Sequence, residues 1–114
     1  MVLFRPVGQQ ELDLIAEQDY RAFPPRLEGQ PIFYPVLNEE YATEIAIQWN
    51  TRDAASGFVG YVLKFTVADE YIKNFAVQTV GAAHQQEYWI PAGELDEFNQ
   101  NIVERIEIVK RINA

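Results

Sequence analysis

The segment from Phe58 to Val67 constrains the fold more than any other part of the chain. Apolar residues occupy every second position of this segment: Val59, Tyr61, Leu63, Phe65 and Val67. A period of two residues places these side chains on one face of an extended strand. The pattern therefore predicts a β-strand with its apolar face on the core, and the other elements must cover that face.

Two earlier segments repeat their apolar residues at helical spacing instead. Residues 9–18 predict a helix with the buried stripe Leu12, Ile15 and Ala16. Residues 39–49 predict a second helix, because Asn38 is a favourable N-cap and the first turn is acidic. Its predicted buried face is Ala42, Ile45, Ala46 and Trp49. A third, short helix is predicted over residues 92–99, with its apolar side inward at Leu95 and Phe98.

The remaining apolar segments predict short strands at residues 2–5, 32–34, 76–80, 87–90 and 102–112. Pro6, Pro35 and Pro91 are expected to end three of them, because proline donates no hydrogen bond to a ladder. The last segment has its apolar face at Ile106, Ile108 and Ile112. This order of short strands and helices predicts one α+β domain over residues 1–114, with a mostly antiparallel mixed sheet of about six strands and three short helices.

Composition excludes several classes of partner. The 114 residues carry a net charge of −8 and no cysteine. An acidic surface repels phosphate backbones and anionic lipid, so neither nucleic acid nor a membrane is an expected partner. No apolar run approaches the ~20 residues that span a bilayer, and residues 1–6 lack the pattern of a signal peptide. Without cysteine there is no disulfide framework. We therefore expect a cytoplasmic protein.

The residue inventory also excludes several kinds of active site. A single histidine and no cysteine do not make a zinc site, and no metal is expected. The single serine, Ser56, lies in no nucleophile-elbow motif. The six glycines match no phosphate-binding or dinucleotide fingerprint.

Arginines of the N-terminal half are the first candidate feature. This half contains four basic residues and no lysine: Arg5, Arg21, Arg26 and Arg52. Arg21 and Arg26 flank Phe23 in a segment, residues 21–31, that contains three prolines. Arginine suits a planar, bidentate grip on phosphate or carboxylate. The alternative is that these arginines pair with the many nearby carboxylates.

The second candidate feature is the segment from His84 to Pro91. Glu87 precedes a run of aromatic and apolar residues, so its carboxylate is expected at the rim of a cleft. There it could orient a sugar hydroxyl or stabilise a cationic transition state. The alternative is a solvated carboxylate at a strand edge. His84 is interpreted as a loop residue, because nothing in the sequence fixes a partner for it.

Three segments resemble the motifs of the ADP-ribosyltransferase superfamily. Leu3-Phe4-Arg5 resembles the first-strand motif, in which an Arg or His after two apolar residues contacts NAD. Residues 31–35 and the helix after them resemble the second motif, a short strand that leads into a helix. Gln85-Gln86-Glu87 resembles the third, in which a Glu begins a late strand and a Gln stands two residues earlier. The second motif lacks a Ser-Thr-Ser, and Phe33 stands where one branch of the superfamily has its tyrosine.

This resemblance implies an ADP-ribosyltransferase-like fold with NAD as a ligand. Arg5 would grip the phosphate or ribose, and Phe33 or Tyr34 would stack near the nicotinamide. Glu87 would hold the ribose as the catalytic residue. The rest of the implied cofactor site is Arg21, Arg26 and Gln85.

The whole chain also resembles a group of small bacterial proteins labelled "ADP-ribosylation/crystallin-J family". The resemblance is carried by Arg-Ala-Phe-Pro-Pro-Arg-Leu at residues 21–27 and Pro-Ile-Phe-Tyr-Pro-Val at residues 31–36. A 114-residue, strand-rich chain differs from the large helical, metal-dependent ADP-ribosylglycohydrolases that this label suggests.

Three functions remain open at this point. The favoured one is a non-catalytic module that binds a nucleotide or a protein partner, because the catalytic motifs are incomplete. The alternative is an active NAD-dependent ADP-ribosyl transferase or NAD glycohydrolase that uses Glu87. A third interpretation is a structural subunit whose exposed sheet edges pair into a homo-oligomer.

Overall fold

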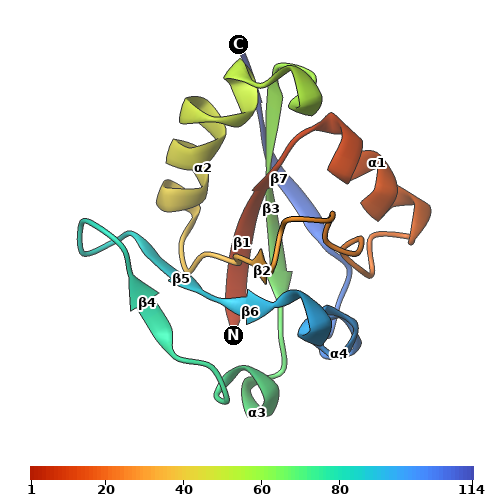
Figure 1. The fold of residues 1–114 in the computed structure, drawn as a ribbon, viewed down its shortest axis with the longest axis vertical. Coiled ribbons are helices and arrows are strands. Elements are labelled where there is room, and N and C mark those ends of the chain that lie inside the picture. The colour runs from red at the N-terminus through yellow and green to blue at the C-terminus, as the bar shows by residue number, and fades with distance from the viewer.

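The computed structural model describes residues 1–114 and is organised around the predicted central strand, β3 (Val59–Thr66). β3 pairs antiparallel with β1 (Val2–Val7) on one side and with β7 (Glu107–Asn113) on the other (Figure 1). Its side chains are buried on both faces at most positions. Val62 and the other apolar residues at the alternate positions therefore pack on the second face of the sheet.

A single bridging residue extends this sheet. Val36 exchanges backbone hydrogen bonds of 2.8 Å with Phe4 of β1 in both directions. On its other side Val36 pairs with Glu87 of β5 (Gln86–Tyr88), and β5 pairs with β4 (Val77–Thr79). A separate antiparallel ladder joins β2 (Ile32–Phe33) to β6 (Ile90–Pro91). All strand pairs are antiparallel, and the α+β class is confirmed.

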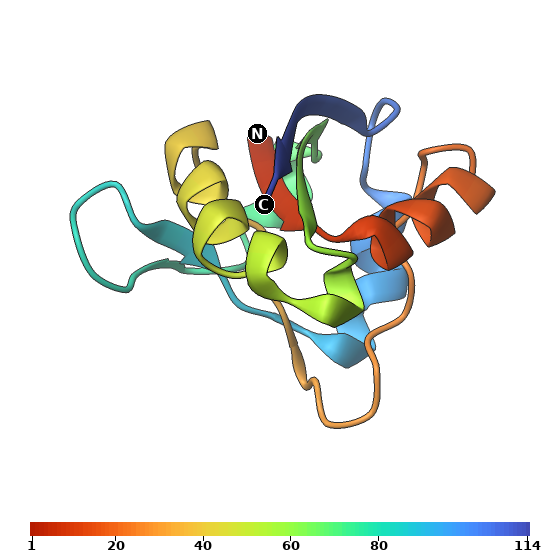
Figure 2. The same ribbon diagram turned by 90° about the horizontal axis from the view of Figure 1, so that it is seen from above.

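Helices cover the two faces of the central sheet unequally. α2 (Glu39–Gln48) packs on one face through a small cluster that joins its alanines to Val36 and Val62. α1 (Gln9–Glu17) and α4 (Leu95–Gln100) belong to the larger cluster on the other face. Figures 1 and 2 show α1 and α2 on opposite sides of the central strands. The short elements are α3 (Asp69–Ile72), η1 (Asn50–Arg52), η2 (Ala54–Ser56) and η3 (Ala92–Glu94).

Four phenylalanines form the centre of the larger cluster. Phe23 lies 5.0 Å from Phe33 and 4.8 Å from Phe65, measured between ring centroids, and Phe98 lies 5.3 Å from Phe33. Asn99 fixes the backbone at Phe23, because its amide accepts from Phe23 N and donates to Phe23 O. The proline-containing segment is therefore held in the core at both ends, by Phe23 and by Phe33.

The capping prediction for α2 is confirmed. Asn38 accepts a hydrogen bond of 2.8 Å from the backbone amide of Tyr41, as an N-cap does. Leu95 and Phe98 are buried as expected. The helix predicted over residues 9–18 is α1, and the helical turn of α3 adds a fourth helix to the three expected.

Pro6 does not end the first strand, contrary to the prediction. The Phe4 amide points away from β3 towards Val36, and the alternation of an antiparallel ladder turns the nitrogen of Pro6 to the same side. Pro6 still pairs in register with Val62 of β3. The nitrogen of Pro6 therefore lies on the outer edge of β1, beyond the single Val36 bridge. No strand pairs with β1 there, so the absence of an N–H costs no ladder hydrogen bond.

Three apolar residues predicted to be inward are exposed instead: Ala16, Trp49 and Ile108. The indole of Trp49 is 65% exposed, because the chain leaves the α2 helix there and enters η1. Ile108 is also exposed, because β7 is an edge strand whose register on β3 shifts between Val62 and Leu63. The shift breaks the simple alternation of the segment. Pro91 is the last residue of β6, and η3 begins directly after it, so the strand ends at this proline as predicted.

No helix of the structure combines the length and the apolar character that crossing a membrane requires.

Close packing of α2 on β3 depends on Gly60. A Cβ atom added at Gly60 would lie 2.8 Å from the Cβ of Ala46. We expect Gly60→Ala to lower the free energy of unfolding by roughly 1–3 kcal/mol, because the helix must shift. Urea denaturation measures the change. Gly93→Ala is the matched control, since a Cβ there meets no atom within 4 Å, and an equal loss in both variants would contradict this account.

Candidate functional site

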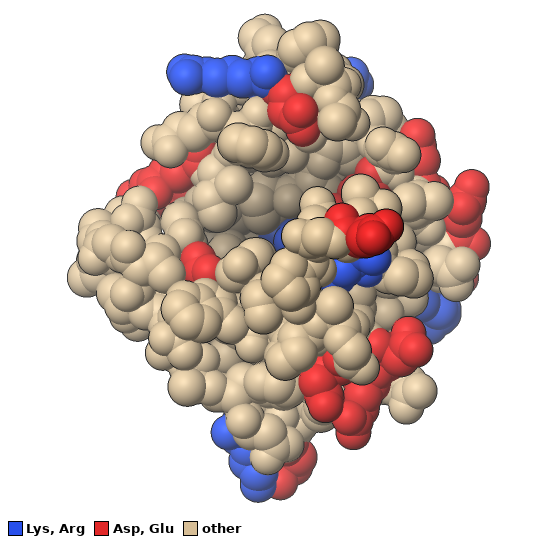
Figure 3. Space-filling view, in the orientation of Figure 1, with Lys and Arg blue, Asp and Glu red and all other residues tan.

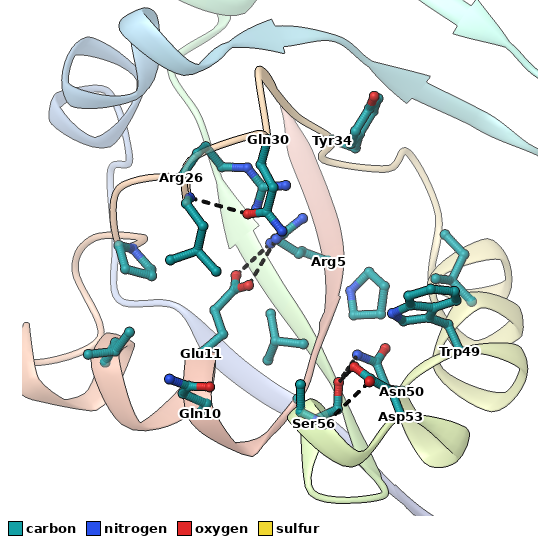
Figure 4. Close-up of a pocket in the computed structure, with 18 of the residues that line it drawn as sticks. Arg5, Gln10, Glu11, Arg26, Gln30, Tyr34, Trp49, Asn50, Asp53 and Ser56 are labelled. Atoms are coloured by element: carbon teal, nitrogen blue, oxygen red, sulfur yellow. Dashed lines mark hydrogen bonds and ion pairs between the residues drawn. The ribbon is translucent and has the colours of Figure 1, made fainter.

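A cleft of about 490 Å³ opens beside β1, between α1, the proline-containing segment and the turns that follow α2. The space-filling view shows this hollow near the centre of the face, with basic side chains at its wall (Figure 3). The close-up places Arg5 and Arg26 together on one side of the cleft, and Trp49 and Asn50 on another (Figure 4).

Arg5 forms the floor of the cleft. It projects from β1 and is buried, and its guanidinium lies 4.6 Å from the centroid of the Phe33 ring. Glu11 of α1 binds it in a bidentate pair, with Arg5 Nε donating at 2.7 Å and Nη2 at 3.0 Å. This geometry is the strongest kind of arginine–carboxylate contact. Glu11 therefore neutralises Arg5 and holds it in place.

Arg26 is the second cation of the cleft, and it has no carboxylate partner within ion-pair distance. Its Nε donates to the backbone oxygen of Ile32 at 3.1 Å, which leaves both terminal nitrogens without a protein acceptor. Burial lowers the pKa of Arg26, and the positive charge of Arg5 lowers it further, although Glu11 and Tyr34 act in the opposite direction. A cation in this position is stabilised by a bound anion.

Glu87 supplies a carboxylate on the far side of Val36. It is only 8% exposed, yet it lines the cleft. One carboxylate oxygen accepts from the Tyr41 hydroxyl and the other from Trp89 Nε1, both at 2.8 Å. No cation pairs with it. The two donors hold the carboxylate in one orientation and leave lone pairs free for a ligand hydroxyl.

Two aromatic side chains stand at the rim. Tyr34 and Trp49 both line the cleft and are exposed. Exposed aromatic rings beside a polar cleft offer flat surfaces on which a base can stack. The cleft thus combines an arginine that lacks a counter-ion, a fixed carboxylate and exposed rings, which suits a ligand with a phosphate, hydroxyls and a planar group.

Four of the residues expected from the sequence share this cleft: Arg5, Arg26, Tyr34 and Glu87. The Val36 bridge explains why Arg5 and Glu87 line one cleft, because Val36 pairs with β1 on one side and with β5 on the other. The other three lie elsewhere. Phe33 is 1% exposed in the core, so its ring supports Arg5 from below and has no surface for a nicotinamide.

Arg21 and Gln85 lie outside the cleft. Arg21 is exposed, and its Nε lies 3.5 Å from an Asp19 carboxylate oxygen, which is the surface pairing considered from the sequence. Gln85 donates to Glu44 at 3.2 Å and accepts from the Ala82 amide at 2.9 Å. Its side chain therefore holds the turn between β4 and β5 and does not point towards a ligand.

Sequence reasoning missed part of the lining. Glu11 is one of many acidic residues, and nothing in the sequence marks it as the partner of Arg5. The helical period of residues 39–49 predicts Trp49 on the buried face of the helix, whereas the structure places it at the rim of the cleft. Other polar lining residues that the sequence did not single out lie on α1, in the proline-containing segment and in the stretch after Trp49: Gln10, Gln30, Asn50, Asp53 and Ser56. A polar stretch directly after an amphipathic helix was the only available signal for them.

One group of side chains elsewhere has the composition of a metal site. Ligand atoms of Glu40, Glu44 and His84 lie within 4.8 Å of one another. His84 Nε2 and Glu44 are already 2.8 Å apart, and hydrogen bonds from His84 and Gln85 lower the pKa of Glu44. These residues are partly or fully exposed. His84 and Gln85 both contact Glu44, and these contacts, here called the His84 latch, join the β4–β5 turn to α2.

Comparisons with protein-family models, with curated proteins and with solved structures found no match to this chain. The resemblance to ADP-ribosyltransferases and to the small bacterial proteins therefore stays a prediction from the motifs. The geometry of the cleft carries the functional argument.

The hydroxyl of Tyr41 makes stability sensitive to high pH. Burial, aided by the hydrogen bond to Glu87, raises the pKa of Tyr41 from 10.0 to about 12. The folded state therefore favours the protonated phenol, and this stabilisation is complete below pH 10 and is lost as the pH rises towards about 12. We expect Tyr41→Phe to be less stable than the wild type at neutral pH, by about 1–2 kcal/mol.

That difference should shrink as the pH rises from 10 to about 12. Urea titrations across this range measure it. Tyr34→Phe, whose exposed hydroxyl makes no hydrogen bond within the protein, is the matched control and should differ little from the wild type. A Tyr41→Phe deficit that stays constant with pH would contradict the assignment of the shift to this contact.

Proposed function

We propose that this protein is a nucleotide-binding module whose cleft takes a dinucleotide of the NAD class. The observation that carries the proposal is Arg26, a partly desolvated arginine without a counter-ion, in the same cleft as the fixed carboxylate of Glu87. Each group meets a different part of a nucleotide.

The phosphates are placed at Arg26. Its free terminal nitrogens form a donor fork of the kind that binds phosphate oxygens in pairs. Arg5 lies beside it, and its remaining donors can assist while Glu11 holds the guanidinium in place. The chain carries a net charge of −8, so a cation without a carboxylate partner, such as Arg26, is a favourable place for an anion.

A ribose is placed at Glu87. The carboxylate accepts hydrogen bonds from Tyr41 and Trp89 and has further lone pairs for sugar hydroxyls. Tyr34, exposed at the rim, can stack on a planar group attached to that ribose. These placements agree with the roles that the superfamily resemblance implies for Glu87 and Tyr34.

Binding without turnover is favoured over catalysis. Glu11 occupies the Arg5 guanidinium in a bidentate pair, and the second motif lacks its Ser-Thr-Ser. One observation favours the alternative, an ADP-ribosyl transferase or NAD glycohydrolase. A carboxylate that is buried, oriented by two donors and unpaired with a cation can stabilise the charged ribose formed when nicotinamide leaves.

Calorimetric titration with NAD tests the proposal. We expect Arg26→Gln to weaken binding about tenfold or more, because a charge-assisted contact to phosphate is lost. Arg21→Gln is the matched control: Arg21 belongs to the same proline-containing segment but pairs with Asp19 outside the cleft. Its variant should bind NAD as the wild type does.

Failure of the wild type to bind NAD would reject the nucleotide proposal and direct the search to a protein partner. Equal weakening in both arginine variants would show that long-range charge, and not the cleft, attracts the ligand. Release of nicotinamide by the wild type, lost in Glu87→Gln, would replace the binding module by the enzymatic alternative.

A further inference from the structure

We propose that the His84 latch is a zinc site, in which Glu40, Glu44 and His84 hold a Zn²⁺ ion that locks the β4–β5 turn onto α2. None of the three side chains lines the nucleotide cleft, so the inference goes beyond the proposed function and does not rest on it. The single histidine predicted no zinc site from the sequence. The fold supplies what the sequence spacing lacks, because it brings Glu44 and His84 together across 40 residues.

The donor atoms lie close to the separations that a zinc ion needs. Zinc bonds of about 2.0–2.2 Å to nitrogen and oxygen place the donors of a tetrahedral site roughly 3.3–3.6 Å apart. Here Nε2 of His84 lies 2.8 Å from a carboxylate oxygen of Glu44, and the donor atoms of all three residues lie within 4.8 Å of one another. Small rotations of these accessible side chains would admit the ion, and a water would take the fourth position.

The two carboxylates form a like-charged pair that a cation would stabilise. Glu40 and Glu44 are four residues apart on α2, so they project from neighbouring positions of one helix face. Like charges at this spacing destabilise a helix. Glu44 has the ring of His84 opposite it, whereas the exposed side chain of Glu40 makes no hydrogen bond or ion pair within the protein. A divalent cation would neutralise both carboxylates at once.

Contacts outside the ligand set hold the turn that carries His84. Asn38 Nδ2 donates to the backbone oxygen of His84 at 2.6 Å, at the N-terminal end of α2 (Figure 1). Gln85 Nε2 donates at 3.2 Å to the oxygen of Glu44 that does not face His84, and the Gln85 side chain accepts from the Ala82 amide at 2.9 Å. Outer contacts of this kind orient the ligands of a metal.

The donor types favour zinc over the hard cations. Imidazole nitrogen together with carboxylate oxygen suits Zn²⁺, whereas Mg²⁺ and Ca²⁺ prefer sites built from oxygen alone. Nε2 of His84 can bind the ion while Nδ1, which makes no hydrogen bond within the protein, carries the ring proton. The chain has one histidine and no cysteine, so no other imidazole or thiolate competes for the ion.

Titration of the untagged protein with ZnCl₂ tests the inference, with the ring of His84 followed by NMR. Because His84 is the only histidine, its ring nitrogens give signals that need no further assignment. We expect saturable binding of one zinc per chain, a shift of the Nε2 signal and a rise in the thermal unfolding midpoint, since an ion that binds only the folded state stabilises it. MgCl₂ at the same concentration should leave the ring signals unchanged.

Substitution of Glu40 separates metal coordination from the hydrogen bonds of the latch. Glu40→Gln removes a ligand and none of the latch contacts, so we expect calorimetry to show zinc binding about tenfold weaker or more. Glu39→Gln is the matched control, because it removes the same charge from the same turn of α2. The Glu39 carboxylate lies 2.9 Å from Lys110 Nζ, outside the site, and its variant should bind zinc as the wild type does. His84→Gln should abolish saturable binding.

Three outcomes would overturn the inference. In the first, neither the His84 ring nor the unfolding midpoint of the wild type responds to zinc. In the second, Glu39→Gln and Glu40→Gln weaken binding equally, because zinc would then respond only to the charge of α2. In the third, saturable binding survives in His84→Gln, which would place the ion elsewhere. None of these results involves NAD, so failure here leaves the nucleotide proposal standing.

Discussion

The site depends on the backbone hydrogen bonds of Val36. Val36 is held on one side by Phe4 of β1 and on the other pairs with Glu87 of β5, so one residue spans the gap between two parts of the sheet. Arg5 and Glu87 are more than eighty residues apart along the chain, and this bridge is what brings them to one cleft. The proline-containing segment can run over the same face because Phe23 and Phe33 anchor it in the aromatic cluster. Core packing therefore sets the position of Arg26 relative to Arg5.

Electrostatics then distinguishes the two arginines. Glu11 binds Arg5 in a bidentate pair, and the Phe33 ring lies against the same guanidinium, so Arg5 is a fixed structural cation. Arg26 lies near enough for Arg5 to lower its pKa, and it lacks an ion-pair partner. A bound phosphate relieves this situation most directly.

Local signals predicted much of the fold. The alternation in β3, the N-cap of α2 and the inward Leu95 and Phe98 follow from chemistry within a few residues, and the structure confirms them. Features that depend on distant neighbours were not predictable. Pro6 is tolerated only because its edge of β1 has no partner there. Trp49 continues the helical period but lies where the helix has ended. Arg21 and Arg26 look alike in sequence, and only the path of the chain between Phe23 and Phe33 turns one outward and the other into the cleft.

The central claim is that groups from both halves of the chain form one nucleotide-binding cleft. The most direct test is an NMR titration of the isotopically labelled protein with NAD, in which every backbone amide reports its own environment. The account predicts that the shifting amides gather around Arg5, Arg26, Trp49 and Glu87, while those of Arg21 and the β4–β5 turn stay in place. Shifts that gather at the His84 latch or along β7, or no shifts at millimolar NAD, would contradict it.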